Sequence, residues 1–193
     1  RHLKKIHTEP VYGLGILPGS DEGGIYTLNA ARSLKTFVDK VDHLFLFDND
    51  AWRESAESVQ GGYDAINEKI VRRFGLLFRS GEIHAGQDVA ESVIDSSEID
   101  TTDATNRITS LVRKATLGRL TLPCEVEGTE RGLLVVAGPP PYLNRKGIEH
   151  GRKWLEEQTG SMQVRGGDFP YTTENTVAVI VVLAGLVNVP RIK

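Results

Sequence analysis

Amide and aromatic side chains follow an apolar run early in the sequence, in a pattern suited to binding a purine base. The run at residues 44–47 stops at an acidic turn that contains Asn49, and Tyr63 and Asn67 follow. If the run is a buried strand, the Asn49 carboxamide lies at the carboxyl edge of a sheet, where open α/β folds bind ligands. An amide can pair with a base edge, and a tyrosine ring can stack on the base. Tyr63 and Asn67 are four residues apart in a helical pattern, so they share one face and predict half of a nucleotide site.

A pair of carboxylates lies beyond the other end of this helical pattern. Asp88 and Glu91 follow a helix predicted over residues 62–79, which spans about 27 Å. The pair is therefore too far away to touch the nucleotide that Tyr63 binds. In a head-to-tail stack of protomers, Asp88 and Glu91 can orient a water beside the neighbour's terminal phosphate and accept its proton, while upstream backbone and a magnesium ion neutralise the phosphates. Because such contacts do not close, the pattern predicts filaments whose hydrolysis requires assembly.

Each of these residues has an ordinary structural alternative. An aromatic residue on an apolar stripe, as Tyr63 is, commonly packs in a core, and an asparagine such as Asn67 can satisfy a helix end. Taken alone, Asp88 and Glu91 favour helix capping over catalysis. Their place after the long helix, together with Asn49, favours the functional interpretation.

The elements that must position these residues are an α/β unit followed by a long helix. Residues 11–17 predict a strand, the turn from Asp21 to Gly24 opens a helix of about 17 residues that ends near Val41, and residues 43–47 predict a second strand. Strand, helix and strand suggest a right-handed parallel crossover, so both strand ends feed loops on one edge of the sheet. The 62–79 helix follows, with an apolar stripe at spacings of three and four.

The remainder reads as a second domain. A helix is predicted to begin after Asp88, another covers residues 105–115, and a strand covers residues 133–137. Asn144 is expected to cap a helix that ends at Gly160, and residues 177–187 predict a long buried strand.

Composition restricts the class of protein. The chain has 193 residues, 39% of them hydrophobic, which predicts a folded protein, and its net charge of −3 supplies no basic field for nucleic acid. Cys124 is the single cysteine, which favours a reducing cytoplasm. The longest apolar run is shorter than a membrane helix of about 20 residues, so no transmembrane segment is predicted. Five histidines show no paired metal spacing, so no metal ligand is assigned.

Taken in order, these residues resemble the tubulin and FtsZ superfamily, and most closely its archaeal CetZ group, over nearly the whole chain. The segment from Phe47 to Ala51 is similar to the one after the sixth strand of the family's GTPase domain, which implies that Asn49 contacts guanine. Tyr63 and Asn67 match the tubulin-type pair that stacks on guanine and reads its edge, where FtsZ proteins more often carry Phe and Asp. Glu22 aligns with an acidic residue that hydrogen-bonds the ribose.

The same resemblance assigns the carboxylate pair. The segment from Asp88 to Glu91 resembles the synergy loop, whose two acidic residues complete the GTPase site of the next subunit in a protofilament. The combination of Asp88 and Glu91 is nearer to alpha-tubulin than to the paired Asp of FtsZ.

The fold class implied is α/β: the C-terminal part of a Rossmann-like tubulin/FtsZ GTPase domain (residues 1–61), a long central helix (62–80) and an α+β activation domain (81–193). The function implied is a cytoplasmic, cytoskeletal GTPase that binds GTP and GDP, with Mg²⁺ on the phosphates, and self-associates head to tail into protofilaments for cell shape control. The alternatives are an FtsZ-like cell-division GTPase and a non-hydrolysing interaction module with a decayed nucleotide site.

The sequence departs from the family pattern in four places. The glycine-rich phosphate loop is not among these residues, and we expect it upstream of Arg1. Near Asp100 the family has a further strand and a lateral-contact loop, whereas here a helix follows almost at once, so we expect that residues are missing at this point. Gly86 stands where relatives often have Asn, and Tyr26 where FtsZ has Arg.

Overall fold

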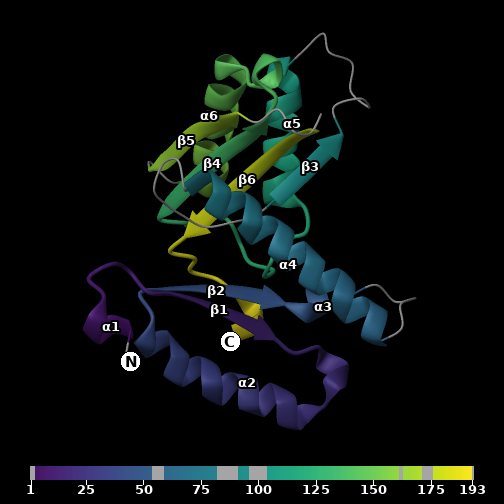
Figure 1. Cartoon of the computed structure of the whole chain (residues 1–193), viewed down its shortest axis with the longest axis vertical. Helices are drawn as coiled ribbons and strands as arrows, with labels where there is room; N and C mark the ends of the chain where they lie inside the picture. The colour runs from purple at the N-terminus through teal and green to yellow at the C-terminus, as the bar shows by residue number, and fades with distance from the viewer. Residues whose placement is uncertain are drawn as a thin grey trace. The chain divides into compact units, whose positions relative to one another are not determined.

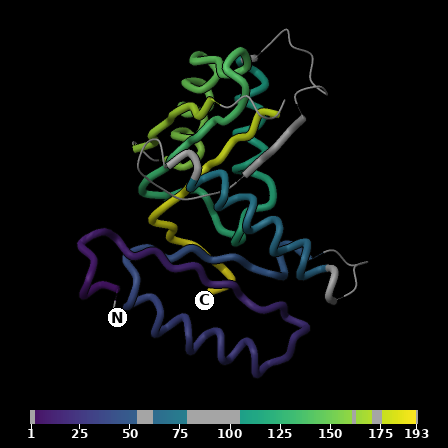
Figure 2. Tube along the Cα trace, viewed as in Figure 1, coloured from purple at the N-terminus to yellow at the C-terminus, as the bar shows by residue number. Residues whose placement is uncertain are grey.

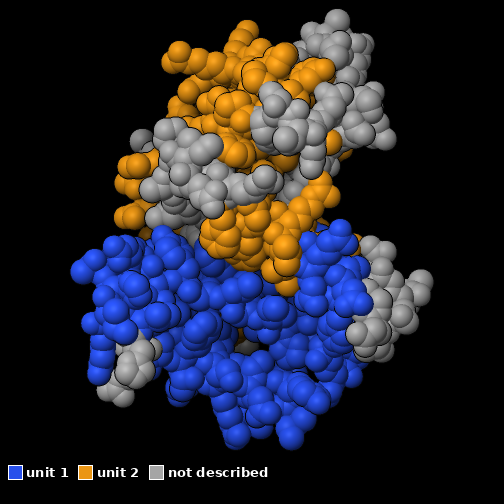
Figure 3. Space-filling model, viewed as in Figure 1, with its two compact units in different colours: residues 1–68 blue, residues 69–193 orange. Residues whose placement is uncertain are grey.

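The computed structural model describes residues 3–53, 59–81, 91–95, 104–160, 163–170 and 176–192. The chain divides into two compact units, Arg1–Glu68 and Lys69–Lys193, which Figure 3 shows in different colours. The division falls inside the long helix α4 (Val59–Gly81). The assignment of residues 1–61, 62–80 and 81–193 to separate domains remains a proposal.

The first unit is built on two parallel strands, β1 (Tyr12–Leu17) and β2 (His43–Asp48). A short helix α1 (Leu3–Ile6) precedes them, and helix α2 (Gly24–Phe37) with the 3-10 turn η2 (Val38–Lys40) connects them (Figure 1). The register runs from Tyr12 opposite His43 to Leu17 opposite Asp48. The predicted parallel crossover is therefore confirmed.

Glycine in β1 lets the crossover segment lie close to the strand. A Cβ built on Gly13 would lie 2.7 Å from the ring of Phe37, at the end of α2, and 2.8 Å from Val41. A larger side chain at residue 13 would displace the Phe37 ring and the Val41 side chain. Because Leu17 and Asp48 are paired, the turns after both strands, η1 (Ser20–Glu22) and α3 (Asn49–Trp52), leave from the same sheet edge.

The second unit contains a four-stranded sheet in the order β3–β6–β4–β5. Its strands are β3 (Glu91–Asp95), β4 (Arg131–Gly138), β5 (Val164–Pro170) and β6 (Thr176–Ala184). Strand β6 runs antiparallel to both β3 and β4, and β5 runs parallel to β4. The path of the chain through these strands can be followed in Figure 2.

Helices cover both faces of this sheet. On one face, α5 (Ala104–Leu117) and α6 (Arg145–Thr159) bury a core with the inward residues of the strands, among them Ile108, Leu155 and Val179, each 0% exposed. On the other face, Leu77 of α4 packs against Ile180 and Val182. Successive side chains of β6 enter these two cores in turn, which explains why the sequence of β6 is almost continuously apolar.

Several predicted elements are confirmed, with small shifts of their ends. Helices α4 and α5 and strand β4 are each longer than predicted. The Asn144 side chain caps α6 by accepting the Gly147 N–H at 3.2 Å, and Gly160 ends the helix at a φ of 68°. Strand β6 ends at Ala184 rather than Val187, because Gly185 turns the backbone at a φ of 75°.

One prediction about the second unit is wrong, and one strand is not predicted. Residues after Asp88 were predicted to begin a helix, but Glu91–Asp95 forms strand β3 and pairs with the buried strand β6. Pairing along the open edge of β6 satisfies backbone groups there, so the tertiary context outweighs a local helix-start signal. Strand β5 was not predicted, because its adjacent Gly166 and Gly167 and its terminal Pro170 are residues that disfavour strands. They are tolerated because β5 is an edge strand.

Candidate nucleotide site

Asn49 is the first residue of α3 and follows β2 directly, as the sequence predicts. The Asp48 carboxylate caps this turn by accepting the Asp50 N–H at 3.1 Å. The Asn49 side chain is buried, with 7% exposed, and its Oδ1 atom has no hydrogen-bond partner within the described part of the chain. Because an unsatisfied buried acceptor is costly, this oxygen suits a donor from a bound ligand.

The turn that carries Glu22 is tied to α3. The Gly19 N–H donates to Glu22 Oε1 at 2.6 Å, and the Ser20 N–H donates to Asp50 Oδ1 at 2.8 Å. The first bond closes the η1 turn on itself, and the second links it to the residue after Asn49. The Glu22 carboxylate is therefore held at the sheet edge that Asn49 also occupies.

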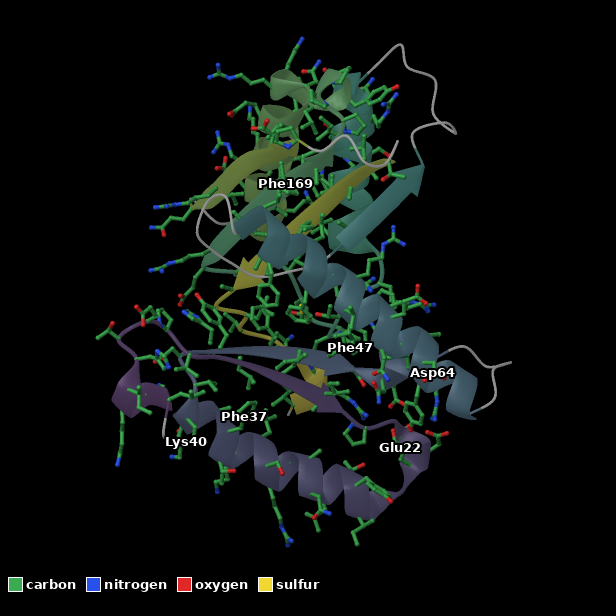
Figure 4. The ribbon with its side chains drawn as sticks, in the orientation of Figure 1. Glu22, Phe37, Lys40, Phe47, Asp64 and Phe169 are labelled. Carbon is green, nitrogen blue, oxygen red and sulfur yellow. The ribbon has the colours of Figure 1, made fainter. Side chains whose placement is uncertain are left out.

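Tyr63 reaches this turn from the start of α4. Its hydroxyl donates a hydrogen bond to Glu22, which is the main reason that the pKa of Tyr63 is raised above the usual tyrosine value, with desolvation second. In Figure 4 the labelled Glu22 and Asp64 mark the two segments that this bond joins, η1 and the start of α4. The structure thus brings together two side chains that lie far apart in the sequence.

Arg53 is the residue of this site that sequence reasoning missed. It forms an ion pair with Asp21, its Nη2 atom donates to Tyr63 Oη at 3.4 Å, and its guanidinium carbon lies 5.4 Å from the centre of the Tyr63 ring. Its backbone N–H closes the turn that Asn49 begins, but no spacing in the sequence indicates that its side chain reaches Tyr63.

The structure gives less detail about the remaining predicted site residues. Asn67 is exposed on α4, one helical turn after Tyr63. Asp88 lies outside the described residues, and of Glu91 the structure gives its place as the first residue of β3. The pairing of Asp88 with Glu91 stays a prediction.

The charge around the site suits the polar, uncharged part of a nucleotide. Asp21, Glu22 and Asp50 place carboxylates beside Asn49, which favour hydroxyl and N–H donors over phosphate oxygens. Within the described ranges, no group of three or more His, Cys, Asp or Glu side chains is arranged to hold a metal ion. None of the helices in those ranges is long and apolar enough to cross a membrane.

The arrangement of strands and helices is that of the tubulin/FtsZ-like fold. An FtsZ dimer from M. jannaschii superimposes with a TM-score of 0.74 at 18% identity, covering 95% of this chain and 56% of that one. At this identity the likeness concerns the fold alone.

The chain belongs to the tubulin-like CetZ family. Residues 56–102 and 99–193 match the family described as "Tubulin-like CetZ, C-terminal domain". The chain is 60% identical to the tubulin-like protein CetZ1 of Haloferax volcanii over 236 residues, which cover all of this chain and 60% of that protein.

Solved structures of two relatives match closely. The GDP-bound monomer of Haloferax volcanii CetZ1 has a TM-score of 0.89 at 65% identity, and the GTPγS-bound protofilament of CetZ2 from the same organism has a TM-score of 0.89 at 41% identity. Each match covers 99% of this chain and 60% of the other. The chain thus spans about 60% of the length of these relatives.

Proposed function

We propose that the chain supplies the base- and ribose-binding half of a guanine nucleotide site in a cytoskeletal GTPase. The observation that carries the proposal is the buried, unpartnered Oδ1 atom of Asn49. Guanine carries N–H donors at N1 and N2 and adenine carries one at N6, so an orphaned acceptor fits a purine base, and the choice of guanine rests on the relatives. The CetZ1 and CetZ2 structures, which hold GDP and GTPγS, support a guanine nucleotide as the ligand.

The neighbouring side chains fit the other parts of the nucleoside. Glu22 keeps acceptor capacity after bonding Gly19 and Tyr63, because an ionised carboxylate accepts about four hydrogen bonds, so it can accept from ribose hydroxyls. Tyr63 offers its ring for stacking on the base, and Asn67 lies one turn further along the same helix to read the base edge.

Hydrolysis and assembly belong to the same proposal. The 23 residues of α4 extend over about 35 Å, and Asp88 and Glu91 follow that helix in sequence. We infer that they act on the nucleotide of the next protomer, where one positions a water and the other accepts its proton. Magnesium, held by the phosphates, would neutralise their charge. The CetZ2 protofilament supports assembly of this kind, and control of cell shape in the cytoplasm is the proposed role.

A comparison of GTP with ATP tests the base-binding assignment. In the protein expressed from its complete reading frame, we expect GTP to bind more tightly than ATP. Replacing Asn49 with alanine removes the acceptor, so Asn49→Ala should weaken GTP binding by about 10-fold to 100-fold and abolish the preference for GTP. Equilibrium binding of fluorescent GTP, with ATP as competitor, measures both effects.

Asn29→Ala is the matched control, because Asn29 is an exposed asparagine on α2. It should leave GTP binding unchanged. If the wild-type protein binds neither nucleotide, the interaction module with a decayed site becomes the better description. If Asn49→Ala binds GTP as the wild type does, Asn49 is not the selecting residue.

A further inference from the structure

Arg53 connects three elements of the candidate site at one point. Its backbone N–H donates to the Asn49 carbonyl at 3.1 Å, and its side chain reaches Asp21 of η1 and Tyr63 of α4. The side chain is 22% exposed, so most of it is withdrawn from water. In the proposed function, other residues make the contacts with the base, the ribose and the phosphates, and Arg53 has no role.

The Tyr63 hydroxyl is held from two directions. It donates to Glu22 and accepts from Arg53 Nη2 at 3.4 Å, which uses its single donor and one acceptor position. The Arg53 guanidinium also lies 5.4 Å from the ring centre, within the range of a cation–π contact. Together these contacts fix the plane of the Tyr63 ring before any ligand arrives.

The ion pair of Arg53 with Asp21 adds little to folding stability, because the Asp21 side chain is 67% exposed and water screens the attraction. Its structural effect is to anchor the guanidinium. Gly19 leaves room for this arrangement, since a Cβ there would lie 3.0 Å from Arg53 Nη1. The planar fork of arginine presents separate N–H groups to a carboxylate and a hydroxyl while its flat face lies over a ring, whereas a compact lysine ammonium has no flat face to stack.

We propose that Arg53 is a positioning residue for the nucleotide base, which holds the Tyr63 ring in the plane in which that ring stacks. This inference rests on the proposed function of the site. Arg53 acts through Tyr63 and not through its charge on the phosphates. A ring that is already ordered loses less conformational freedom when the base binds, so the affinity for the base is higher.

Guanosine and GDP distinguish positioning from a charge effect, because guanosine carries no phosphate. The affinities of both are measured for the wild type, Arg53→Gln and Arg53→Lys in the protein expressed from its complete reading frame. We expect Arg53→Gln to weaken both ligands by the same factor, about 10-fold, and Arg53→Lys to lose nearly as much although it keeps the charge. A loss confined to GDP and restored by lysine, or no loss at all, would overturn the proposal.

A double variant tests whether Arg53 acts through Tyr63. If it does, Arg53→Gln should cost nothing further in a Tyr63→Ala background, because the ring that it orients is gone. Additive losses would overturn the positioning role while leaving the proposed function intact. Failure of the wild type to bind either ligand would instead overturn the proposed function, so the two failures are distinguishable.

Alkaline titration of tyrosine absorbance supplies a readout that general damage to the fold does not mimic. The positive charge of Arg53 lowers the pKa of Tyr63, against the larger raising effect of the hydrogen bond to Glu22. The titration step that belongs to Tyr63 is the step that is lost in Tyr63→Phe. In Arg53→Gln this step should therefore move to higher pH. Arg32→Gln, at an exposed arginine of α2, is the control and should leave it in place. An unmoved signal in Arg53→Gln would contradict the contact.

Discussion

Replacing Glu91 with alanine is expected to leave GTP binding unchanged and to lower the hydrolysis rate by at least about 100-fold. The proposed role of Glu91 is to accept a proton from the attacking water in a neighbour's site, so its removal affects the chemical step and spares the base contacts of its own protomer. Filaments should form and persist, because the nucleotide in them is no longer hydrolysed. Phosphate release and sedimentation, measured on the same samples, report both properties.

Mixing two inactive variants tests whether the carboxylates act between protomers. Glu91→Ala retains a nucleotide site, and Asn49→Ala retains the carboxylates, so a mixed filament contains junctions at which both are intact. Hydrolysis should return when the variants are combined at a GTP concentration that fills the Glu91→Ala site but not the weakened Asn49→Ala site, at which neither variant is active alone. Mixtures that stay inactive although the two variants are shown to co-assemble would show that the division between protomers is wrong.

Glu157→Ala serves as the matched control for Glu91→Ala. Glu157 is an exposed glutamate on α6, so its removal should change neither binding nor turnover. Normal turnover in Glu91→Ala would remove the catalytic assignment of Glu91 and leave the base-binding assignment untouched.

The sequence predicts the first unit better than the second, for a physical reason. Strands β1 and β2 and the helical connection between them are local, and their ends are set by residues with strong preferences such as Pro18, Gly19 and Asn49. The same local signals place Asn144 at the start of α6 and Gly160 at its end. Such caps can be read from sequence because each partner lies within a few residues.

Strands β3 and β5 depend on distant partners and could not be predicted in the same way. The glycines and proline of β5 disfavour a strand, and the acidic residues before β3 resemble a helix start. Each strand forms because a buried neighbour offers a free edge, β6 for β3 and β4 for β5. Arg53 was missed for a related reason. Its position next to Tyr63 depends on how η1, α3 and α4 meet, which no spacing along the chain records.

Replacing Gly147 with valine is expected to lower the free energy of unfolding of the second unit by about 3 kcal/mol. Gly147 and Gly151 are buried on α6 where it crosses α5, and they let the two helices approach closely. A Cβ on Gly147 would lie 2.9 Å from Ile108 Cδ1 and 3.1 Å from the Cα atom of Thr105. The Ile108 side chain has little room to move, because it is 0% exposed within the core, and backbone at Thr105 cannot give way without shifting α5.

Urea unfolding followed by the fluorescence of Trp154, which packs against the same core, measures this loss as a lower midpoint at an unchanged slope. Gly75→Ala in α4 is the matched control, because a Cβ on Gly75 would meet no atom within 4 Å. Alanine there should stabilise the helix by about 0.5–1 kcal/mol, since glycine loses more backbone freedom on folding. The free energy of unfolding should fall in Gly147→Val and rise in Gly75→Ala. These opposite signs distinguish the effect of close helix packing from that of backbone entropy. An unfolding midpoint for Gly147→Val equal to that of the wild type would mean that α5 and α6 are not packed as closely as the structure indicates.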